Sequence, residues 1–187
     1  MMLSQTINPP TVSLRVANSA DTSRLEQIVH LAYRGGISTV SWKNEDYLVK
    51  GPRIAAPELQ ALIVSETATI LVAEITKEVT DLVGCVLVEN HGADAHIGLL
   101  AVSPDCQNLG LGKLLVKAAE DYAYSQFRCC SAKMFVLSGR DELLGWYKRL
   151  GYLETGETTP FPVPETGLKA LQNNAHFIVI SKNIQTE

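Results

Sequence analysis

A glycine-rich turn in the middle of the chain stands between two regular patterns. The segment "CQNLGLGKLLVKAAEDYA", residues 106–123, contains Gly110 and Gly112 and then continues with apolar residues at helical spacing. The two glycines are therefore predicted at the N-terminus of a helix. Unpaired backbone N–H groups and the positive end of the helix dipole favour an anion at this place, and a backbone without Cβ atoms lets the anion approach closely.

Two familiar phosphate-binding loops do not match this segment. A Walker loop requires a glycine at the position of Gln107 and a serine or threonine at the position of Leu114. A dinucleotide fingerprint requires a third glycine where the chain has Leu115. The remaining pattern is Q-x-x-G-x-G after the strand-like residues 95–104. A strand, a short turn and a helix in this order aim several amides at a pyrophosphate.

The composition bounds the class of protein. The 187 residues are 46% apolar, which is enough for a single domain with a sizeable core. A net charge of −4 without a block of Lys and Arg argues against nucleic acid as a partner. Without a long apolar run or a leader-like start we expect no membrane contact and a cytoplasmic protein. The four cysteines lack metal-ligand spacing, so we expect free thiols that serve as small apolar residues, and no metal.

Hydrophobic periodicity predicts a single α/β domain over residues 12–184, preceded by a tail over residues 1–11. Residues 35–54 and the proline-bearing residues 158–167 are predicted as irregular loops. The order β-α-α-β-β-β-α-β-α-β-β implies a mixed sheet with helices on both faces. Six of these seven strands are assigned bounds, 12–18, 69–75, 81–90, 95–102, 132–138 and 176–184, and the helices begin near 19, 57, 113 and 141.

The segment "IGLLAVSPDCQNLGLGKLL", followed by "DELLGWYKRLGY" at 141–152, resembles the GNAT superfamily of N-acetyltransferases. The resemblance implies a single-domain GNAT-like mixed sheet and acetyl-CoA as the acetyl donor. It also implies that the strand residues Leu100, Ala101 and Val102 offer backbone hydrogen bonds to the pantetheine arm. The implied pyrophosphate site consists of Gln107, Asn108, Leu109, Gly110, Leu111, Gly112 and Lys113.

Two residues near the second motif have implied roles. Tyr147 is similar to the family tyrosine whose hydroxyl faces the cofactor sulfur and can protonate the departing thiolate. Proton transfer from a phenol (pKa near 10) to a thiolate (near 8.5) is uphill by about 2 kcal/mol, so a hydrogen bond to the sulfur can matter more than the transfer. The alternative for Tyr147 is simple packing. Arg140 stands where many relatives have an asparagine and either binds a phosphate or the acceptor, or is a solvated charge.

The reaction also requires a neutral amine. For a lysine-like amine, deprotonation at neutral pH costs about 4 kcal/mol, whereas an α-amine costs below about 1 kcal/mol. His96 stands where some family members have a glutamate as general base, and histidine has a suitable pKa. The alternatives are a strand-edge histidine bound to backbone, and a water relay.

The acceptor is predicted to contact residues 34–58 and 155–175, which include Trp42, Glu45, Asp46, Arg53 and Phe161. Acidic groups suit a cationic amine, and Arg53 suits a carboxylate. We therefore expect direct acetyl transfer, without an acyl-enzyme, to the primary amine of a small or amino-acid-like molecule. Two alternative functions are open: acetylation of a peptide or protein amine, and a non-catalytic acyl-CoA sensor. Assembly into a homodimer is open as well.

Overall fold

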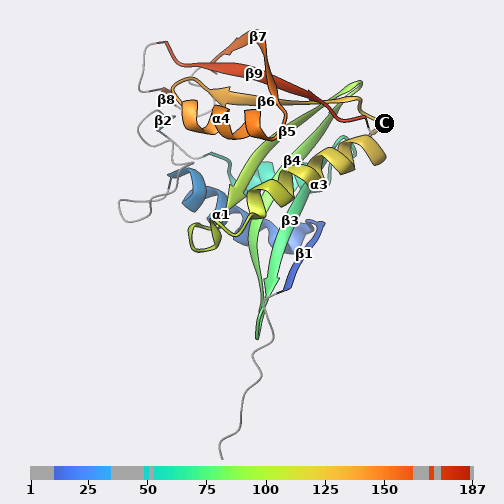
Figure 1. The fold of residues 1–187 in the computed structure, drawn as a ribbon. Helices are drawn as coiled ribbons and strands as arrows, with labels where there is room; N and C mark the ends of the chain where they lie inside the picture. Colours follow the sequence, from blue (N-terminus) through green and yellow to red (C-terminus); the bar gives the residue numbers. More distant parts are fainter. Residues whose placement is uncertain (1–10, 35–48, 51–52, 162–168, 171–173, 186–187) are drawn as a thin grey trace, which may run out of the picture.

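A computed structural model of the protein describes residues 11–34, 49–50, 53–161, 169–170 and 174–185 (Figure 1). Trp42, Glu45 and Asp46 lie outside the described residues. The elements in chain order are β1 (Thr11–Val16), η1 (Ser19–Asp21), α1 (Thr22–Arg34), β2 (Val49–Lys50), α2 (Ala56–Ile63), β3 (Ala68–Thr76), β4 (Thr80–His91), β5 (Asp94–Val102), η2 (Pro104–Cys106), α3 (Leu111–Ser125), β6 (Ser131–Leu137), α4 (Asp141–Arg149), β7 (Leu153–Pro160), β8 (Lys169–Ala170) and β9 (His176–Asn183).

The main sheet has seven strands in the order β1-β3-β4-β5-β6-β9-β7. Neighbouring strands are antiparallel except β5 and β6, which run parallel. β5 and β6 pair only through residues 94–96 and 131–133, at the beginning of both strands. Beyond these residues no ladder joins β5 to β6, so within the described residues no strand pairs with this side of β5 up to Val102.

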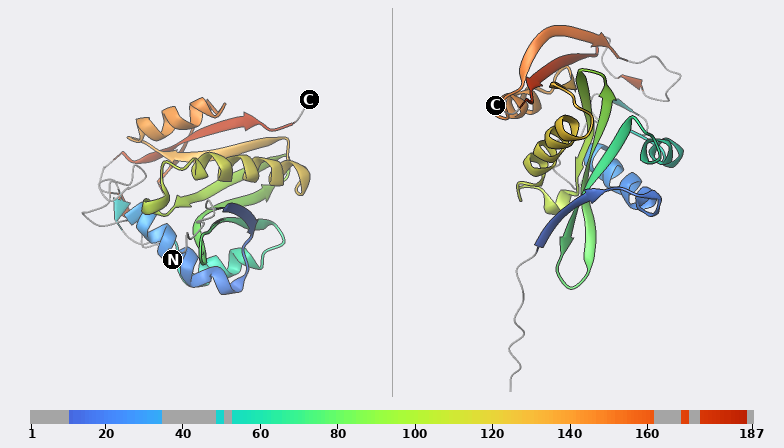
Figure 2. Two further views of the ribbon diagram at one scale, coloured as in Figure 1. Left: turned by 60° about the horizontal axis from the view of Figure 1, so that its bottom comes forward. Right: turned by 90° about the vertical axis from the view of Figure 1, so that its right-hand side faces the viewer.

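Helices cover both faces of the sheet, as predicted (Figure 2). α1 and α2 pack on one face, where Leu25, Ile28 and Leu59 are fully buried. α3 and α4 lie on the other face, where Leu115, Ala119 and Leu144 belong to a second buried cluster. The central strand β4 has a continuous buried run from Leu82 to Val88, because both of its faces are covered. The expected mixed α/β sheet is therefore confirmed.

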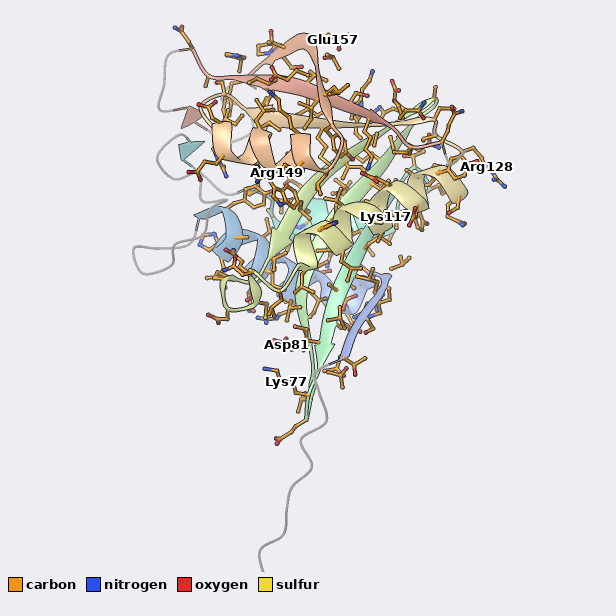
Figure 3. The ribbon with its side chains drawn as sticks, viewed as in Figure 1. Lys77, Asp81, Lys117, Arg128, Arg149 and Glu157 are labelled. Carbon is orange, nitrogen blue, oxygen red and sulfur yellow. The ribbon has the colours of Figure 1, made fainter. Side chains whose placement is uncertain are left out.

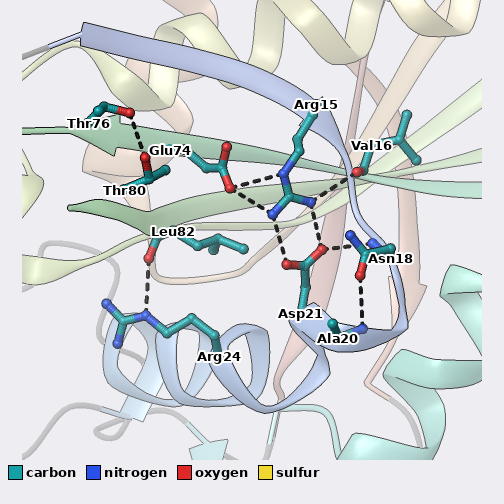
Figure 4. A network of polar contacts seen from close by, with 10 residues as sticks. All are labelled: Arg15, Val16, Asn18, Ala20, Asp21, Arg24, Glu74, Thr76, Thr80 and Leu82. Atoms are coloured by element: carbon teal, nitrogen blue, oxygen red, sulfur yellow. Dashed lines mark hydrogen bonds and ion pairs between the residues drawn. The ribbon is translucent and has the colours of Figure 1, made fainter.

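The N-terminal end of α1 is fastened to the sheet through Arg15 of β1 (Figure 4). The guanidinium donates to both carboxylate oxygens of Asp21, at 2.7 and 2.9 Å, and to Glu74 of β3 at 2.7 Å. Asp21 also accepts the backbone N–H of Asn18 at 2.8 Å, which completes a capping box. The hydrogen bond from Arg15 lowers the pKa of Asp21. Charge-assisted bonds thus fix where α1 leaves the sheet.

Three details differ from the sequence prediction. β2 lies in the segment 35–54 that was expected to be irregular and forms a two-stranded ladder with β8, for which no element was predicted, and β7 extends to Pro160 inside the expected proline loop. β2 and β8 were not predicted because they have only two residues each. The extent of β7 was not predicted because every one of its residues is exposed, so it has no alternation of buried and exposed positions. All four cysteines are free, but Cys130 is exposed and so is no small apolar core residue. No helix in the described ranges is long and apolar enough to cross a membrane.

Candidate functional site

The turn between β5 and α3 holds its shape through its own backbone and one side chain. The Gln107 amide donates to the carbonyl of Val102 at 3.4 Å, which ties the turn back to the end of β5. Asn108 and Gly110 have positive φ angles of 67° and 77°. Gly110 is the N-cap of α3, and a Cβ at this position would meet no atom within 4 Å. The glycine therefore serves the left-handed backbone and leaves open space beside the helix end.

Backbone donors at the start of α3 point toward this open space. The first helical hydrogen bond runs from the N–H of Leu114 to the carbonyl of Gly110 at 3.1 Å. The N–H groups of Leu111, Gly112 and Lys113 precede it and so have no partner within the helix. They border a cavity of about 710 Å³ that is also lined by Val102, Cys106, Gln107, Asn108 and Gly110. This end of the cavity suits a phosphate group.

α4 forms the opposite wall of the cavity. Its contributions are Asp141, Glu142, Gly145, Trp146 and Arg149. Figure 3 shows Arg149 extending from α4 toward α3. A Cβ on Gly112 would lie 3.6 Å from the Trp146 ring, so the turn and α4 come close together here. Lys113 and Arg149 place positive charge on the two walls of the cavity, and Asp141 and Glu142 of α4 place negative charge there as well, so the case for a diphosphate rests on the amides at the start of α3.

β5 carries a β-bulge just before the turn. In the ladder with β4, Gly98 pairs with Leu87 and Ala101 pairs with Cys85. Leu99 and Leu100 therefore oppose the single residue Val86, which is the arrangement of a bulge. Leu99 has a positive φ of 47°, an unfavourable conformation for a residue with a branched side chain.

The bulge reverses the side-chain alternation along β5. Ile97, Leu100 and Val102 belong to the buried cluster under α3 and α4, whereas Leu99 and Ala101 belong to the cluster under α1 and α2. Strained backbone inside a sheet is found frequently at functional sites, because surrounding contacts must hold it in place.

The predicted cofactor-binding residues fall into two groups. The residues that line the cavity are Val102, Gln107, Asn108, Gly110, Leu111, Gly112 and Lys113. Leu100 and Ala101 are buried in the sheet beside the bulge, and the side chain of Leu109 is 63% exposed outside the lining. Arg140 caps the N-terminus of α4 through its backbone and is buried at 5% exposure. Its side chain therefore does not form the solvated charge that was one of the two alternatives.

Tyr147 lies on the core side of α4, and its side chain is 7% exposed. Its ring meets the rings of Trp146 and Tyr152 edge-on, with centroid distances of 4.9 and 5.9 Å. It belongs to the same buried cluster as Leu100 and Val102. Tyr147 is thus buried in the same core layer as the end of β5, while its neighbour Trp146 lines the cavity.

His96 occupies the other end of β5. It pairs with Lys133 at the last parallel rung between β5 and β6, and its half-buried ring stacks on His91 at 3.8 Å. It lies four residues before Leu100, or about 13 Å along an extended strand. Ala95 and Ile97 belong to the cluster that contains Tyr147, so His96 faces the other side of the sheet. Burial, and to a smaller extent the charges of His91 and Lys133, lower the pKa of His96.

Cysteine and metal chemistry find little support in the described part of the chain. Cys106 lines the cavity, but burial and the neighbouring Asp105 raise the pKa of its thiol, so it stays protonated near neutral pH. No cluster of three or more His, Cys, Asp or Glu side chains is arranged to hold a metal ion in the described residues.

The α4 wall of the cavity was not predicted from the sequence. Glu142, Gly145, Trp146 and Arg149 follow the spacing i, i+3, i+4 and i+7, which places them on one helix face. The spacing itself was visible, but a polar helix face is ordinarily a solvated one. The one indication of a cavity wall in the sequence was that Trp146 and Arg149 share this helix face with Gly145.

Comparisons with known proteins agree on one family and one fold. The family model described as "Acetyltransferase (GNAT) family" matches residues 37–152. No curated protein sequence matches the chain.

Solved structures match over nearly the whole chain. A mutant of spermidine N-acetyltransferase SpeG from Vibrio cholerae has a TM-score of 0.66 at 16% identity, with 92% of this chain and 94% of that chain covered. The enzyme in complex with CoA and spermine gives 0.66 at 15%, with 92% and 95% covered. The Salmonella typhimurium protein yncA with its cofactor acetyl-CoA gives 0.67 at 15%, with 95% and 96% covered. At these identities the likeness establishes the fold alone.

The geometry of the turn predicts the behaviour of Gly110→Asp. The substitution places a Cβ and a negative charge in the open space where we expect the pyrophosphate of CoA, so its affinity for CoA should fall by about tenfold or more. Calorimetry of CoA binding to the folded variant measures this change.

Gly92→Asp is the matched control for Gly110→Asp. Gly92 has the same φ of 77° and the same empty surroundings, but it lies in the β4–β5 turn at the far end of β5. Both variants therefore suffer the same backbone strain, and only Gly110→Asp should lose CoA affinity. Equal CoA affinities in the two variants would disprove the assignment of the turn.

Proposed function

Because the chain belongs to the acetyltransferase (GNAT) family, we propose that it transfers the acetyl group of acetyl-CoA directly to the primary amine of a small, amino-acid-like molecule. The observation that carries this proposal is the cavity at the N-terminus of α3, which is lined by Val102 at the end of β5 and by Trp146, the chain neighbour of the buried Tyr147. Amide donors for a diphosphate and a hydroxyl for a sulfur thus belong to one continuous region of the fold.

The residues of the cavity fit the nucleotide part of CoA. Amides of Leu111, Gly112 and Lys113 would hold the pyrophosphate, and the side chains of Lys113 and Arg149 would balance its charge. The cavity volume of about 710 Å³ lies within the range of ordinary cofactor sites. Bound acetyl-CoA would supply an activated thioester, and the edge of β5 beyond its ladder with β6 is the surface along which its pantetheine arm would lie.

Tyr147 is proposed to stabilise the sulfur of CoA as the thioester bond breaks. Its burial among Trp146 and Tyr152 removes water from the hydroxyl's surroundings, which strengthens a hydrogen bond to a developing thiolate. Full proton transfer is not required, because the ordinary pKa of a thiol is lower than that of a phenol. The cysteines have no part in this reaction, in keeping with the raised pKa of Cys106.

Deprotonation of the amine is proposed to involve His96 through ordered water. Its lowered pKa keeps the ring neutral and able to accept a proton at pH 7. Its position on the other face from Tyr147 excludes a shared contact between the two side chains. The competing explanation is an acceptor with an α-amine, which loses its proton at little cost without a protein base.

Arg53 supports an acceptor that carries a carboxylate. Its guanidinium lies 5.4 Å from the centroid of the Tyr33 ring. It also lines a second cavity of about 260 Å³, together with Glu26, Gln27, His30 and Ile54. No carboxylate among the described residues lies within ion-pair distance of Arg53.

A carboxylate-bearing amine would complement Arg53 in that second cavity. Glu26 on the same wall accepts the N–H of Ala56 at 3.1 Å, so its carboxylate is held in place and supplies the negative charge that suits an ammonium group. Spermine, which is bound in one structural neighbour, carries amines and no carboxylate. The presence of both charges on this wall therefore favours an amino-acid-like acceptor over a polyamine.

Tyr147→Phe tests the proposed role at the sulfur. Its kcat should fall by about tenfold or more, which corresponds to about 1.4 kcal/mol, while its affinity for acetyl-CoA changes little. Steady-state kinetics and calorimetry on the same preparation separate the two quantities. If the variant keeps the wild-type kcat, Tyr147 has a packing role only.

The pH dependence of kcat/KM tests His96. A base with a lowered pKa produces an acidic limb below its ordinary value of about 6.5, and His96→Ala should remove this limb. His91→Ala is the matched comparison, because it removes a neighbouring charge that lowers the pKa of His96 and should shift the limb to higher pH. An identical profile in wild type and His96→Ala would assign deprotonation to solvent.

Matched acceptor pairs test the carboxylate hypothesis. Each α-amino acid is compared with its decarboxylated amine, and CoA release is measured with acetyl-CoA. Wild type should prefer the amino acid, and Arg53→Gln should lower that preference by about tenfold or more, because a charge-assisted hydrogen bond is lost.

Arg24→Gln is the matched control for Arg53→Gln. Arg24 lies near the N-terminal end of α1 and donates to Asp81 at 2.8 Å, so its loss should leave the preference for amino acids unchanged. Acetylation of peptides or of decarboxylated amines, with no amino acid accepted, would contradict the carboxylate hypothesis.

A further inference from the structure

The two edge strands of the main sheet differ in how well they are protected from pairing with another strand. β1 and β7 lie at opposite ends of the strand order (Figure 1). The ladder of β7 with β9 is irregular between Glu154 and Thr158, and Gly156 within this stretch has a positive φ of 84°. β7 also carries the charges of Glu154 and Glu157. Irregular backbone and charged side chains discourage the addition of a further strand, so the edge at β7 is protected.

β1 lacks these protective features. It pairs with β3 in unbroken register from Thr11 to Val16, so its edge is regular. Its one charged side chain, Arg15, is already bound to Asp21 and Glu74 on the α1 side of the sheet. Within the described residues, no strand pairs with the outer edge of β1. A regular, exposed edge strand of this kind is a template for pairing with another strand.

The ladder with β3 determines which backbone groups of β1 point outward. Ala17, which follows β1, donates its N–H to the carbonyl of Ile70 at 2.8 Å and stands opposite this residue in the continued register. Hydrogen-bonded pairs alternate with non-hydrogen-bonded pairs along an antiparallel ladder. Every second residue back along β1 therefore faces β3. The N–H and C=O groups of the residues between them, Val12, Leu14 and Val16, point to the outer edge.

The side chains of the same three residues form an apolar stripe along this edge. Val12, Leu14 and Val16 are 41%, 36% and 50% exposed. Opposite them on β3 stand three residues of the buried cluster under α3 and α4, namely Ile75, Ala73 and Leu71. The stripe is therefore the exposed margin of that cluster. Exposed apolar side chains and outward backbone groups coincide in one short strand.

A second copy of β1 complements this edge. Two copies related by a twofold axis run antiparallel, and with the axis at Leu14 each Leu14 stands opposite its copy while Val12 stands opposite Val16. All of these pairs consist of residues with outward N–H and C=O groups, so each pair can exchange two hydrogen bonds. Moving the axis by one residue in either direction leaves fewer such pairs within β1. Pro10, which directly precedes β1, has no N–H with which to extend the ladder.

The charges at this edge are also compatible with a second copy. On the α1 side of the paired strands, Ser13 would stand opposite Arg15. The Arg15 guanidinium is bound to Asp21 and Glu74, so the pairing brings no uncompensated like charges together (Figure 4). Arg15 also donates to the carbonyl of Val16 at 3.2 Å, and the second lone pair of this oxygen remains for the partner strand.

We propose that β1 is the interface of a homodimer, in which two main sheets join as one continuous sheet with the twofold axis at Leu14. The β7 strands then form both outer edges, so assembly stops at two copies. A strand of six residues is about 20 Å long, and such an edge buries less surface than an interface of standard size. The dimer is therefore weak, with a dissociation constant in the micromolar range.

Sedimentation velocity over a concentration series tests the dimer directly. Wild type should change from monomer to dimer as its concentration rises through the micromolar range. Leu14→Lys places two ammonium groups opposite each other at the centre of the ladder, so it should raise the dissociation constant by about tenfold or more. Leu153→Lys is the matched control, because Leu153 is an exposed leucine in β7 at the opposite edge of the sheet. It should dimerise as wild type does.

Cysteine substitution tests the position of the twofold axis. The background is Cys130→Ser, which removes the exposed native thiol. Leu14→Cys should form an intermolecular disulfide under mild oxidation, because residues paired at the axis have Cα atoms about 5.5 Å apart. Val12→Cys should form none, because it stands opposite Val16 and lies about 14 Å along the strands from its own copy.

Each result has a distinct meaning. Wild type that stays monomeric at every concentration overturns the proposal. A dimer that Leu14→Lys leaves intact also overturns it, because another surface must then hold the two copies. Equal disulfide yields in Leu14→Cys and Val12→Cys contradict the pairing at Leu14. Weaker dimerisation in Leu14→Lys but not in Leu153→Lys, together with a disulfide in Leu14→Cys alone, supports the proposal.

Discussion

The short parallel ladder between β5 and β6 is the constraint on which the site depends. Three residue pairs hold the two strands together at one end, and beyond them no strand in the described part of the chain pairs with that side of β5. In a closed sheet this backbone would be consumed by ladder hydrogen bonds. β9 pairs along the whole of β6 and β7 pairs with β9, so the far half of the sheet is complete without β5. The fold can therefore leave one strand edge available to a ligand.

Much of this arrangement was predictable from the sequence, and the unpredicted parts share a cause. Strands such as β3 and β4 are long apolar runs, and α1 and α3 have clear helical spacing, so tertiary packing agrees with the local pattern. The glycine turn could be placed because Gly110 and Gly112 stand where a helix pattern begins. The bulge could not be predicted, because every residue in "IGLLAV" is apolar or glycine. A reversal of the sheet face on which the side chains lie therefore does not change the hydrophobic pattern.

The two faces of α4 also show how far the sequence pattern can predict the site. Leu143, Leu144 and Tyr147 face the core, while Glu142, Trp146 and Arg149 face the cavity. Amphipathic spacing separates these faces but does not say what lies opposite the polar one. That information comes from the position of α3, which is set by contacts between residues far apart in the chain. Likewise, only the fold reveals that Tyr33 meets Leu100.

The division of the sheet at β5 and β6 also has a consequence for the order in which the chain can assemble. Strands β1, β3, β4 and β5 come from residues 11–102, and β6, β7 and β9 come from residues 131–183. Pairings inside each half close comparatively short loops, which keeps their entropic cost low. During synthesis, the first half can pair its strands before β6 has left the ribosome. α3 lies between the halves in sequence and packs on strands of both, so the helix whose N-terminus borders the cavity also joins the two halves.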